Sequence, residues 1–165
     1  MTDKTQRDFK IELEKSETGS LIRITDVSQA NFDDAYRLAT DLLDRAANLD
    51  SELHQLRLVE QARNKVAMYW IQDGDTKRIS DFISQRSHRI ALSLLDGYPE
   101  GKVQSQIVKE TNISQPTIHI QLSGKVKSVA DYFEKRGNRY FLTKAGLDWV
   151  LRDVIPFVSN SSSDR

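Results

Sequence analysis

The sequence predicts an α+β protein in two parts: an N-terminal β-hairpin with long helices, and a C-terminal helical part that contains a second hairpin. Three observations support this fold class. Apolar and polar residues alternate near the N-terminus, apolar residues recur at helical spacing over residues 32–72, and short extended runs separate helical segments nearer the C-terminus. A composition of 38% hydrophobic and 29% charged residues is typical of a globular chain.

The composition also excludes several classes of site. The chain has no cysteine, so thiolate nucleophiles, disulfides and thiolate metal sites are absent. Its first residues, MTDKTQRDFKIELEK, are polar and contain no apolar run typical of a secretory signal, and nowhere do 18 apolar residues follow one another. We therefore expect a soluble, cytoplasmic protein that makes no membrane contact.

The formal net charge of zero conceals a difference between the two parts. Residues 1–75 carry 10 Lys and Arg against 15 Asp and Glu, whereas residues 76–165 carry 14 against 9. The cationic excess is concentrated in residues 102–144, which hold eight cations and three anions. Such a surface favours a polyanionic partner, and a solvated face is the alternative interpretation.

The N-terminal part begins with a predicted β-hairpin over residues 8–25. In DFKIELEK, Phe9, Ile11 and Leu13 alternate with charged residues, which is the period of a half-buried strand. SETGS then supplies turn residues, and LIRIT has the composition of a second strand.

A long helical segment is predicted over residues 32–72, where apolar residues recur every three to four positions. This length exceeds the usual globular range, so we favour a break at Asp50 or Ser51; a helix stabilised by a partner chain is the alternative. Some of the apolar residues approach a heptad spacing, which Arg63 interrupts, and this favours a homodimer through these helices: Leu49, Leu53, Leu56, Val59, Val66 and Trp70.

The boundary between the two parts is predicted at QDGD, residues 72–75, because Gly74 ends the helical pattern where the charge balance changes sign. The expected organisation has three regions. Residues 1–75 form a β-hairpin and helical region for dimerisation or sensing, residues 76–158 form a second domain, and residues 159–165 form a flexible tail.

The second part predicts a run of helices joined by short turns. A helix over residues 78–97 ends at GYPEG, and VQSQIVKET, the turn NIS and QPTIHIQLSGKV follow as helix, turn and helix. Asn112 tolerates the left-handed conformation at a helix end, Ser114 is the predicted cap of the next helix, and Pro116 fits its first turn.

A second hairpin and a closing helix are predicted in DYFEKRGNRYFLTKAG. Tyr132 and Phe133 lie on one strand, residues 140–142 lie on the other, and the Gly-Asn pair between them suits a hairpin turn. Thr143 is the predicted N-cap of a final helix that ends near Val158.

QIVKETNISQPTIHIQL resembles the helix-turn-helix of the winged-helix transcription regulators, the broad MarR-like and ArsR-like group. FLTKAG is similar to the Leu-Thr-x-x-Gly phrase that follows the wing in this group, and the resemblance covers residues 77–157 only. It implies a C-terminal winged helix-turn-helix whose second helix enters a DNA major groove. The hairpin tip, with Lys135, Arg136 and Arg139, is implied to lie along the backbone or in a minor groove.

The recognition run departs from the usual wording of this group. His119 and Ile120 stand where serine and arginine are usual, and no arginine lies between Arg89 and Arg136, so reading of guanine by a bidentate arginine is not expected here. Glutamines can pair with adenine, Thr117 or Ile120 can contact a thymine methyl, and the helix N-terminus and the cations can bind phosphates. The candidate DNA-binding residues are Ser114, Gln115, Pro116, Thr117, His119, Ile120, Gln121, Lys125, Lys127, Lys135, Arg136, Asn138 and Arg139.

The predicted function is sequence-selective binding of double-stranded DNA by a homodimeric transcription regulator. The alternative is a winged-helix module for protein–protein interaction, which an exposed Ile120 would suit equally well. Catalysis is not expected, because the three histidines lack metal-ligand spacing and no phosphate-binding glycine loop occurs. No cofactor or metal is expected, and a small-molecule effector of the N-terminal region is left open.

Overall fold

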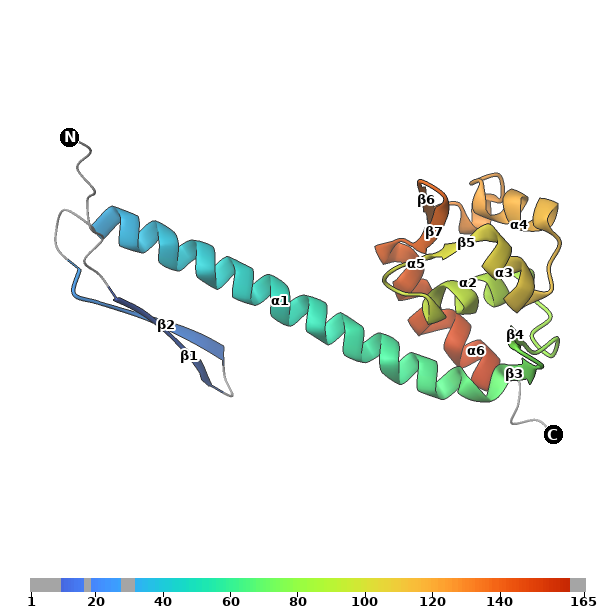
Figure 1. Ribbon diagram of the computed structural model, residues 1–165, viewed down its shortest axis with the longest axis horizontal. Coiled ribbons are helices and arrows are strands. Elements are labelled where there is room, and N and C mark those ends of the chain that lie inside the picture. The colour runs from blue at the N-terminus through green and yellow to red at the C-terminus, as the bar shows by residue number, and fades with distance from the viewer. Residues whose placement is uncertain (1–9, 17–18, 28–31, 161–165) are drawn as a thin grey trace. The chain divides into compact units, whose positions relative to one another are not determined.

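The computed structural model describes residues 10–16, 19–27 and 32–160 (Figure 1). It is a mixed α/β protein with a long N-terminal helix, small antiparallel sheets and C-terminal helices. Two compact units are present, Met1–Leu56 and Arg57–Arg165. Within the described ranges, no helix combines the length and apolar character that a membrane crossing requires.

The N-terminal unit contains the predicted hairpin. Strands β1 (Lys10–Ser16) and β2 (Gly19–Thr25) are antiparallel, with Lys10 opposite Thr25 and Ser16 opposite Gly19. This confirms the hairpin over the described part of residues 8–25; Phe9, which we assigned to the first strand, lies outside the described residues.

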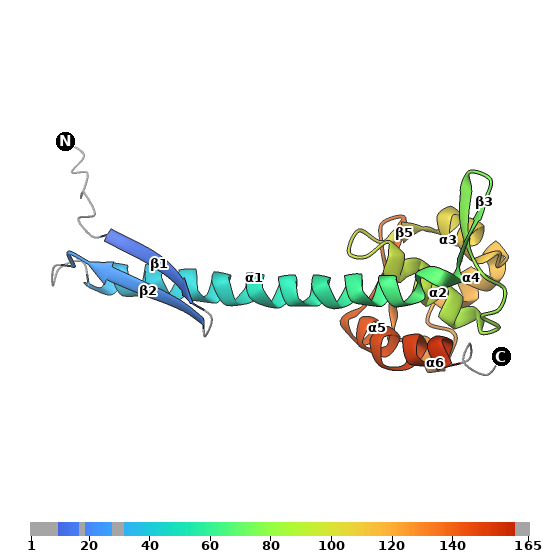
Figure 2. The same cartoon turned by 90° about the horizontal axis from the view of Figure 1, so that it is seen from below.

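Helix α1 (Phe32–Val66) is continuous, so the favoured break at Asp50 or Ser51 is wrong (Figure 2). Asp and Ser are only modestly unfavourable inside a helix, and both are flanked here by strong helix formers such as Leu49, Glu52 and Leu53. The helix also ends earlier than predicted. Residues 67–69 form a 3-10 turn, and the chain then continues as a strand.

The division between the units lies at residues 56 and 57, not at the QDGD segment where we expected it. QDGD instead contributes to a hairpin of β3 (Trp70–Asp73) and β4 (Thr76–Ile79), in which Gly74 adopts a left-handed conformation with φ of +59°. A glycine beside aspartate suits a hairpin turn as well as a linker, and this explains the difference.

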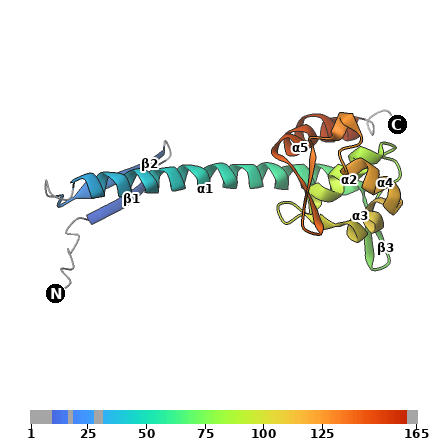
Figure 3. The ribbon, with the colours of Figure 1, turned by 90° about the horizontal axis from the view of Figure 1, so that it is seen from above.

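The C-terminal unit is built from short helices around one three-stranded sheet. Helices α2 (Arg86–Asp96), α3 (Gln104–Thr111) and α4 (Gln115–Leu122) lie side by side (Figure 3). The sheet has the order β5-β7-β6, all antiparallel, with strands β5 (Lys102–Val103), β6 (Phe133–Arg136) and β7 (Arg139–Leu142). The helix predicted from residue 78 begins only at Arg86, because residues 78–79 pair within the β3–β4 hairpin.

The chain closes with α5 (Lys144–Trp149), a π-helical turn (Val150–Val154) and α6 (Ile155–Asn160). The π turn ends two residues before Pro156, a residue that lacks an N–H and disturbs regular helical bonding. Helix thus extends two residues beyond the predicted end at Val158, into what we expected to be tail. Residues 161–165 of that tail lie outside the described residues.

The core of the C-terminal unit includes the last turns of α1. Val59 and Val66 are buried with residues of α2, α3, α4 and the closing helices. Burial of each large aliphatic side chain stabilises the fold by about 1.5–3 kcal/mol. The most completely buried aliphatic residues outside α1 include Ile90, Leu94, Ile107, Ile118, Val150 and Val154.

Candidate nucleic-acid interface

The turn between α3 and α4 has the predicted geometry. Asn112 is left-handed, with φ of 52° and ψ of 34°, and its N–H donates to the Val108 carbonyl at 2.9 Å. Ile113 is buried beside it. Arg89 of α2 donates to the Thr111 carbonyl at 3.1 Å, which satisfies a carbonyl at the end of α3 and fixes α3 against α2.

Ser114 occupies the N-cap position of α4 but does not form the predicted side-chain cap. Its hydroxyl oxygen lies 2.9 Å from that of Thr117, in a hydrogen bond between the two side chains. Pro116 is in the first turn as predicted and has no N–H to offer, so the Ser114 hydroxyl lacks one of its two usual donors. Both hydroxyls therefore lie together at the start of α4.

Helix α4 has one buried face and one outward face. Ile118 and Leu122 are buried in the core, as predicted. Gln115 and His119 are exposed, and Ile120 exposes 47% of its surface. Thr117 and Gln121 lie at the border, half-buried. The outward face therefore offers amide, hydroxyl, imidazole and aliphatic groups, and no charged side chain.

The hairpin of β6 and β7 turns at Gly137 and Asn138, with Gly137 at φ of +59°. The Gly-Asn turn is therefore as predicted, although Tyr132 precedes the strand to which we assigned it and stacks on Trp149 instead. All five residues from Lys135 to Arg139 are exposed.

The cations of this hairpin differ in how tightly contacts within the protein hold them. Arg139 donates to the Gly101 carbonyl at 2.9 Å, so part of its role is to hold the loop that precedes β5. Arg136 pairs with Glu134 and lies over the Phe141 ring at 5.2 Å. Lys135 has a looser contact, with its Nζ 5.5 Å from the centre of the Tyr140 ring.

A surface hollow of about 410 Å³ joins the end of α4 to this hairpin. From α4 and the turn after it come His119, Leu122, Ser123 and Gly124. The opposite wall has Ala130 together with Phe133, Lys135 and Tyr140. The structure therefore brings His119 of the predicted recognition run and Lys135 of the predicted cationic tip to one surface, although they are 16 positions apart in the chain. Arg136 and Arg139 do not line this hollow.

Lys125 and Lys127 follow α4 and are both exposed. Among the described residues, neither forms an ion pair or a side-chain hydrogen bond. They therefore keep their full positive charge available to an anion from outside the protein.

Lys102 contributes to the cationic count of the sequence but not to this surface. Its side chain is buried, with Nζ 2.8 Å from Asp96 and 2.6 Å from Glu110. Burial raises the pKa of Asp96, but hydrogen bonds from Lys102 and Lys77 outweigh this effect and leave that pKa below its usual value. Lys102 is thus a structural cation that ties α2 to α3.

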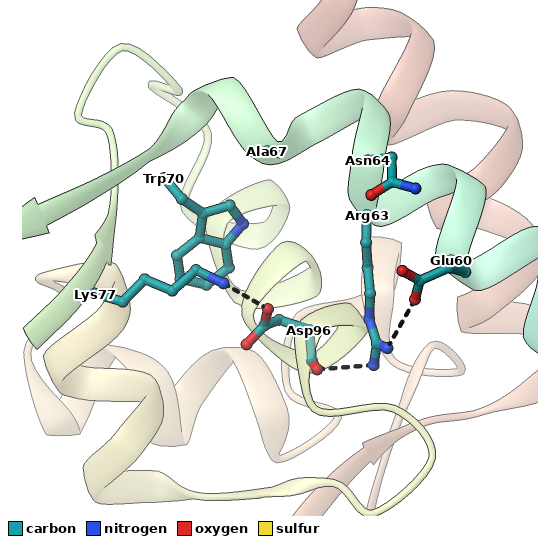
Figure 4. A pocket seen from close by; sticks show the side chains of 7 residues that line it. All are labelled: Glu60, Arg63, Asn64, Ala67, Trp70, Lys77 and Asp96. Atoms are coloured by element: carbon teal, nitrogen blue, oxygen red, sulfur yellow. Dashed lines mark hydrogen bonds and ion pairs between the residues drawn. The ribbon is translucent and has the colours of Figure 1, made fainter.

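A second pocket, of about 340 Å³, lies in the same unit where α1 ends (Figure 4). Arg63 points into it and donates to three backbone carbonyls: Leu95 at 3.1 Å, Asp96 at 2.8 Å and Tyr98 at 2.6 Å. Lys77 pairs with the Asp96 carboxylate at 2.8 Å and lies over the Trp70 ring at 4.2 Å. These charged groups bind one another, so we assign them to the stability of the fold.

Sequence reasoning missed the role of Arg63, which stood out only as an interruption of the heptad spacing. The carbonyls that it binds are at least 32 residues away in the chain, and no local pattern indicates them. Within the described residues, no group of three or more His, Asp or Glu side chains is placed to hold a metal ion.

Comparisons with family models, curated proteins and solved structures found no match to the chain.

Proposed function

We propose that the C-terminal unit is a winged helix-turn-helix and that the protein is a homodimeric transcription regulator that binds double-stranded DNA with sequence selectivity. The element order α2, β5, α3, α4, β6, β7, with β7 central in the sheet, supports the winged-helix part of this proposal. The observation that carries the proposal is the shared surface of α4 and the β6–β7 hairpin. The exposed lysines Lys125 and Lys127 follow Gly124 of that surface in the chain.

In this proposal α4 enters the major groove. Gln115 and Gln121 read adenine through paired hydrogen bonds, and the Thr117 methyl or Ile120 contacts the methyl group of thymine. Since the outward face of α4 has no cation, affinity comes from elsewhere. Lys125, Lys127 and Lys135 neutralise phosphates and contribute equally to every sequence.

Selectivity is tested by enrichment of duplexes from a random pool, followed by measurement of affinity for the enriched sequence. The wild-type chain is expected to enrich one A·T-containing motif, with two-fold symmetry if a homodimer binds. The double variant Gln115→Ala/Thr117→Ala is expected to enrich a different or weaker motif, since removal of each base interaction costs about 1–3 kcal/mol. Gln61→Ala, an exposed glutamine on α1, is the matched control and should leave the motif unchanged.

Failure to enrich any duplex, in a chain shown to be folded, would reject DNA reading. In that case the exposure of Ile120 favours the second candidate, a module that binds protein through the outward face of α4. Ile120→Ser should then abolish capture of the protein partner, and the captured complex should persist in high salt.

A further inference from the structure

Helix α1 carries an unbroken heptad pattern from Ala35 to Leu56. Apolar residues alternate at spacings of four and three, with alanine or leucine at each of these positions. Ala35, Leu42, Leu49 and Leu56 share one heptad position, d, and Ala39, Ala46 and Leu53 share the other, a. After Leu56 the pattern stops, since Glu60 and Arg63 occupy the next two places.

The two halves of this stripe differ in exposure. Ala35 and Ala39 are buried within the chain, with 1% and 8% of their surface exposed, whereas the second half is open to solvent. Leu49, Leu53 and Leu56 expose 59%, 49% and 42% of their surface. Three consecutive exposed leucines on one helix face form an apolar patch that is unusual for a free surface. Most helical stability in proteins comes from packing of an apolar face, so this exposed part of a 35-residue helix favours a packing partner.

We infer that the open half of this stripe pairs with the same residues of a second copy, in a parallel and in-register coiled coil. Residues that flank the stripe select this partner and this orientation. In a parallel pair, each g position of one helix lies beside the e position five residues later in the other helix. Arg45 of one copy then faces Asp50 of the other, and Glu52 faces Arg57.

The third flanking pair also favours the parallel orientation. Leu38 of one copy faces Leu43 of the other, so an apolar residue meets an apolar residue where the charged pairs end. Each described flanking pair within the heptad pattern therefore joins groups that attract, and two-fold symmetry doubles each pair. Arg45, Asp50, Glu52 and Arg57 are all exposed and on the correct side of the helix to form these contacts.

An antiparallel pair is less favourable. In antiparallel coiled coils g faces g and e faces e, and the pairing that overlaps residues 39–56 keeps only the contact between Arg45 and Glu52. It places Asp50 beside Leu43 and Arg57 beside Tyr36, so one kind of charged pair forms where the parallel arrangement forms two. The charge pattern thus specifies orientation as well as association.

The inference deepens the homodimer of the proposed function, but it does not depend on DNA. Each C-terminal unit begins at Arg57, directly after the stripe. A parallel pair therefore brings both units to the same end of the coiled coil, whereas an antiparallel pair would place them at opposite ends. Two reading helices at one end can contact the two halves of one palindromic site.

The absence of cysteine permits a direct test by cross-linking in the absence of DNA. In Leu56→Cys, the two new thiols face each other in a parallel pair, and mild oxidation is expected to give a disulfide-linked dimer in high yield. Leu58→Cys places a thiol of similar exposure at the outer f position and should give little cross-linking. In the antiparallel pair, Leu56 faces residue 39, so self-linking is not expected, whereas copies with Leu42→Cys and Leu53→Cys would link to each other.

A second test reverses the charge of a flanking residue and measures dimer affinity. Arg45→Glu replaces attraction to Asp50 by repulsion and should raise the dimer dissociation constant on the order of tenfold in sedimentation equilibrium. Adding Asp50→Arg should restore it. Arg37→Glu, the same change at an outer f position, is the matched control and should have little effect.

Two results would overturn the inference: a monomeric chain at micromolar concentration, or rescue of Arg45→Glu by Glu52→Arg and not by Asp50→Arg, which is the antiparallel outcome. DNA binding by a monomeric chain would reject the coiled coil and the homodimer but leave the proposed DNA binding standing. A parallel dimer that binds no duplex would reject the DNA binding and leave the coiled coil standing.

Discussion

Gly146 of α5 lies close to the backbone of Tyr132, the residue before β6. A Cβ at this position would lie 2.0 Å from the Tyr132 carbonyl oxygen, which is backbone and has little freedom to move. The neighbouring Thr143 fixes the same contact, because its N–H donates to that carbonyl at 3.1 Å and its hydroxyl accepts from the Gly146 N–H at 2.9 Å. The predicted Thr143 cap is thereby confirmed, and the glycine of FLTKAG has a steric explanation.

Gly146→Ala is therefore expected to lower the free energy of unfolding by about 1–3 kcal/mol, which is the usual range for overpacking. Urea denaturation at fixed protein concentration measures the change. Ala145→Ser alters the adjacent exposed residue and should stay within about 0.5 kcal/mol of wild type. Wild-type stability of Gly146→Ala would show that α5 and Tyr132 are further apart than the structure places them.

His88 is a buried histidine in an aromatic environment. Its ring lies 5.1 Å from that of Phe157 and 5.7 Å from that of Trp149, and in the described part of the chain its Nδ1 has no hydrogen-bond partner. Burial lowers the pKa of His88 below its ordinary value of 6.5. The folded protein thus holds this imidazole neutral under conditions where the unfolded chain protonates it.

Below about pH 6.5 the unfolded chain binds a proton that the folded chain does not, so stability should fall as the pH falls through that value. Between about pH 7.5 and pH 5.5, His88→Phe is expected to lose less unfolding free energy than wild type does. His119→Gln removes an exposed histidine and should retain the wild-type pH dependence. Equal pH dependence in wild type and His88→Phe would contradict the assignment.

Individual residue roles could be predicted where the cause is local. Asn112 at a left-handed helix end and Thr143 at an N-cap each depend on their immediate neighbours, and both predictions are confirmed. Lys102 and Arg63 could not be predicted, because their functions depend on partners brought together by the fold. Ser114 shows the limit of a local argument, since a neighbouring hydroxyl bonds to the group that was expected to cap the helix.

At the scale of elements, Arg63 joins α1 to the end of α2. The last carbonyls of a helix have no intrahelical donor, and the Arg63 guanidinium supplies donors to Leu95, Asp96 and Tyr98. This interaction explains why an arginine interrupts the heptad spacing at the point where α1 enters the core of the C-terminal unit.

Arg63→Ala should destabilise the C-terminal unit by about 1–3 kcal/mol, because it removes three hydrogen bonds from partly buried carbonyls. Arg63→Lys should recover only part of this loss, since a single ammonium cannot reach all three oxygens in the same geometry. Glu60→Ala removes only an exposed ion pair of 3.6 Å with Arg63 and should change stability by less than about 1 kcal/mol. A loss of equal size in Glu60→Ala would instead assign the effect to the ion pair.

Element type was predictable where the apolar period extends over several turns or strands, as in the hairpin of residues 8–25 and the helices around NIS. The prediction of element type failed where a short apolar run fits either a helix or a strand. Ile79, Phe82 and Ile83 fit a helical face, but Ile79 pairs with Trp70 in the β3–β4 hairpin and residues 80–85 contain no helix. Tertiary pairing decided these residues, and helical spacing alone did not indicate it.

At the scale of the whole molecule, the charge difference between the two halves of the sequence corresponds to two different roles in the proposed regulator. In the cationic C-terminal half, Lys125, Lys127 and Lys135 are exposed, and none of them forms an ion pair among the described residues. In the proposed regulator these lysines supply affinity, the outward face of α4 supplies selectivity, and the coiled coil of α1 brings two such surfaces together.

The most direct test of this proposal is the salt dependence of affinity for a duplex, measured by fluorescence anisotropy. We expect the logarithm of the association constant to fall linearly with the logarithm of salt concentration. The double variant Lys125→Ala/Lys127→Ala should bind every duplex more weakly, and the slope should decrease by about one for each phosphate that a copy no longer neutralises. Lys65→Ala/Arg152→Ala removes two exposed cations that line a different pocket, and should retain the wild-type slope. Binding that is absent, or insensitive both to salt and to removal of the Lys125 and Lys127 side chains, would contradict the proposal.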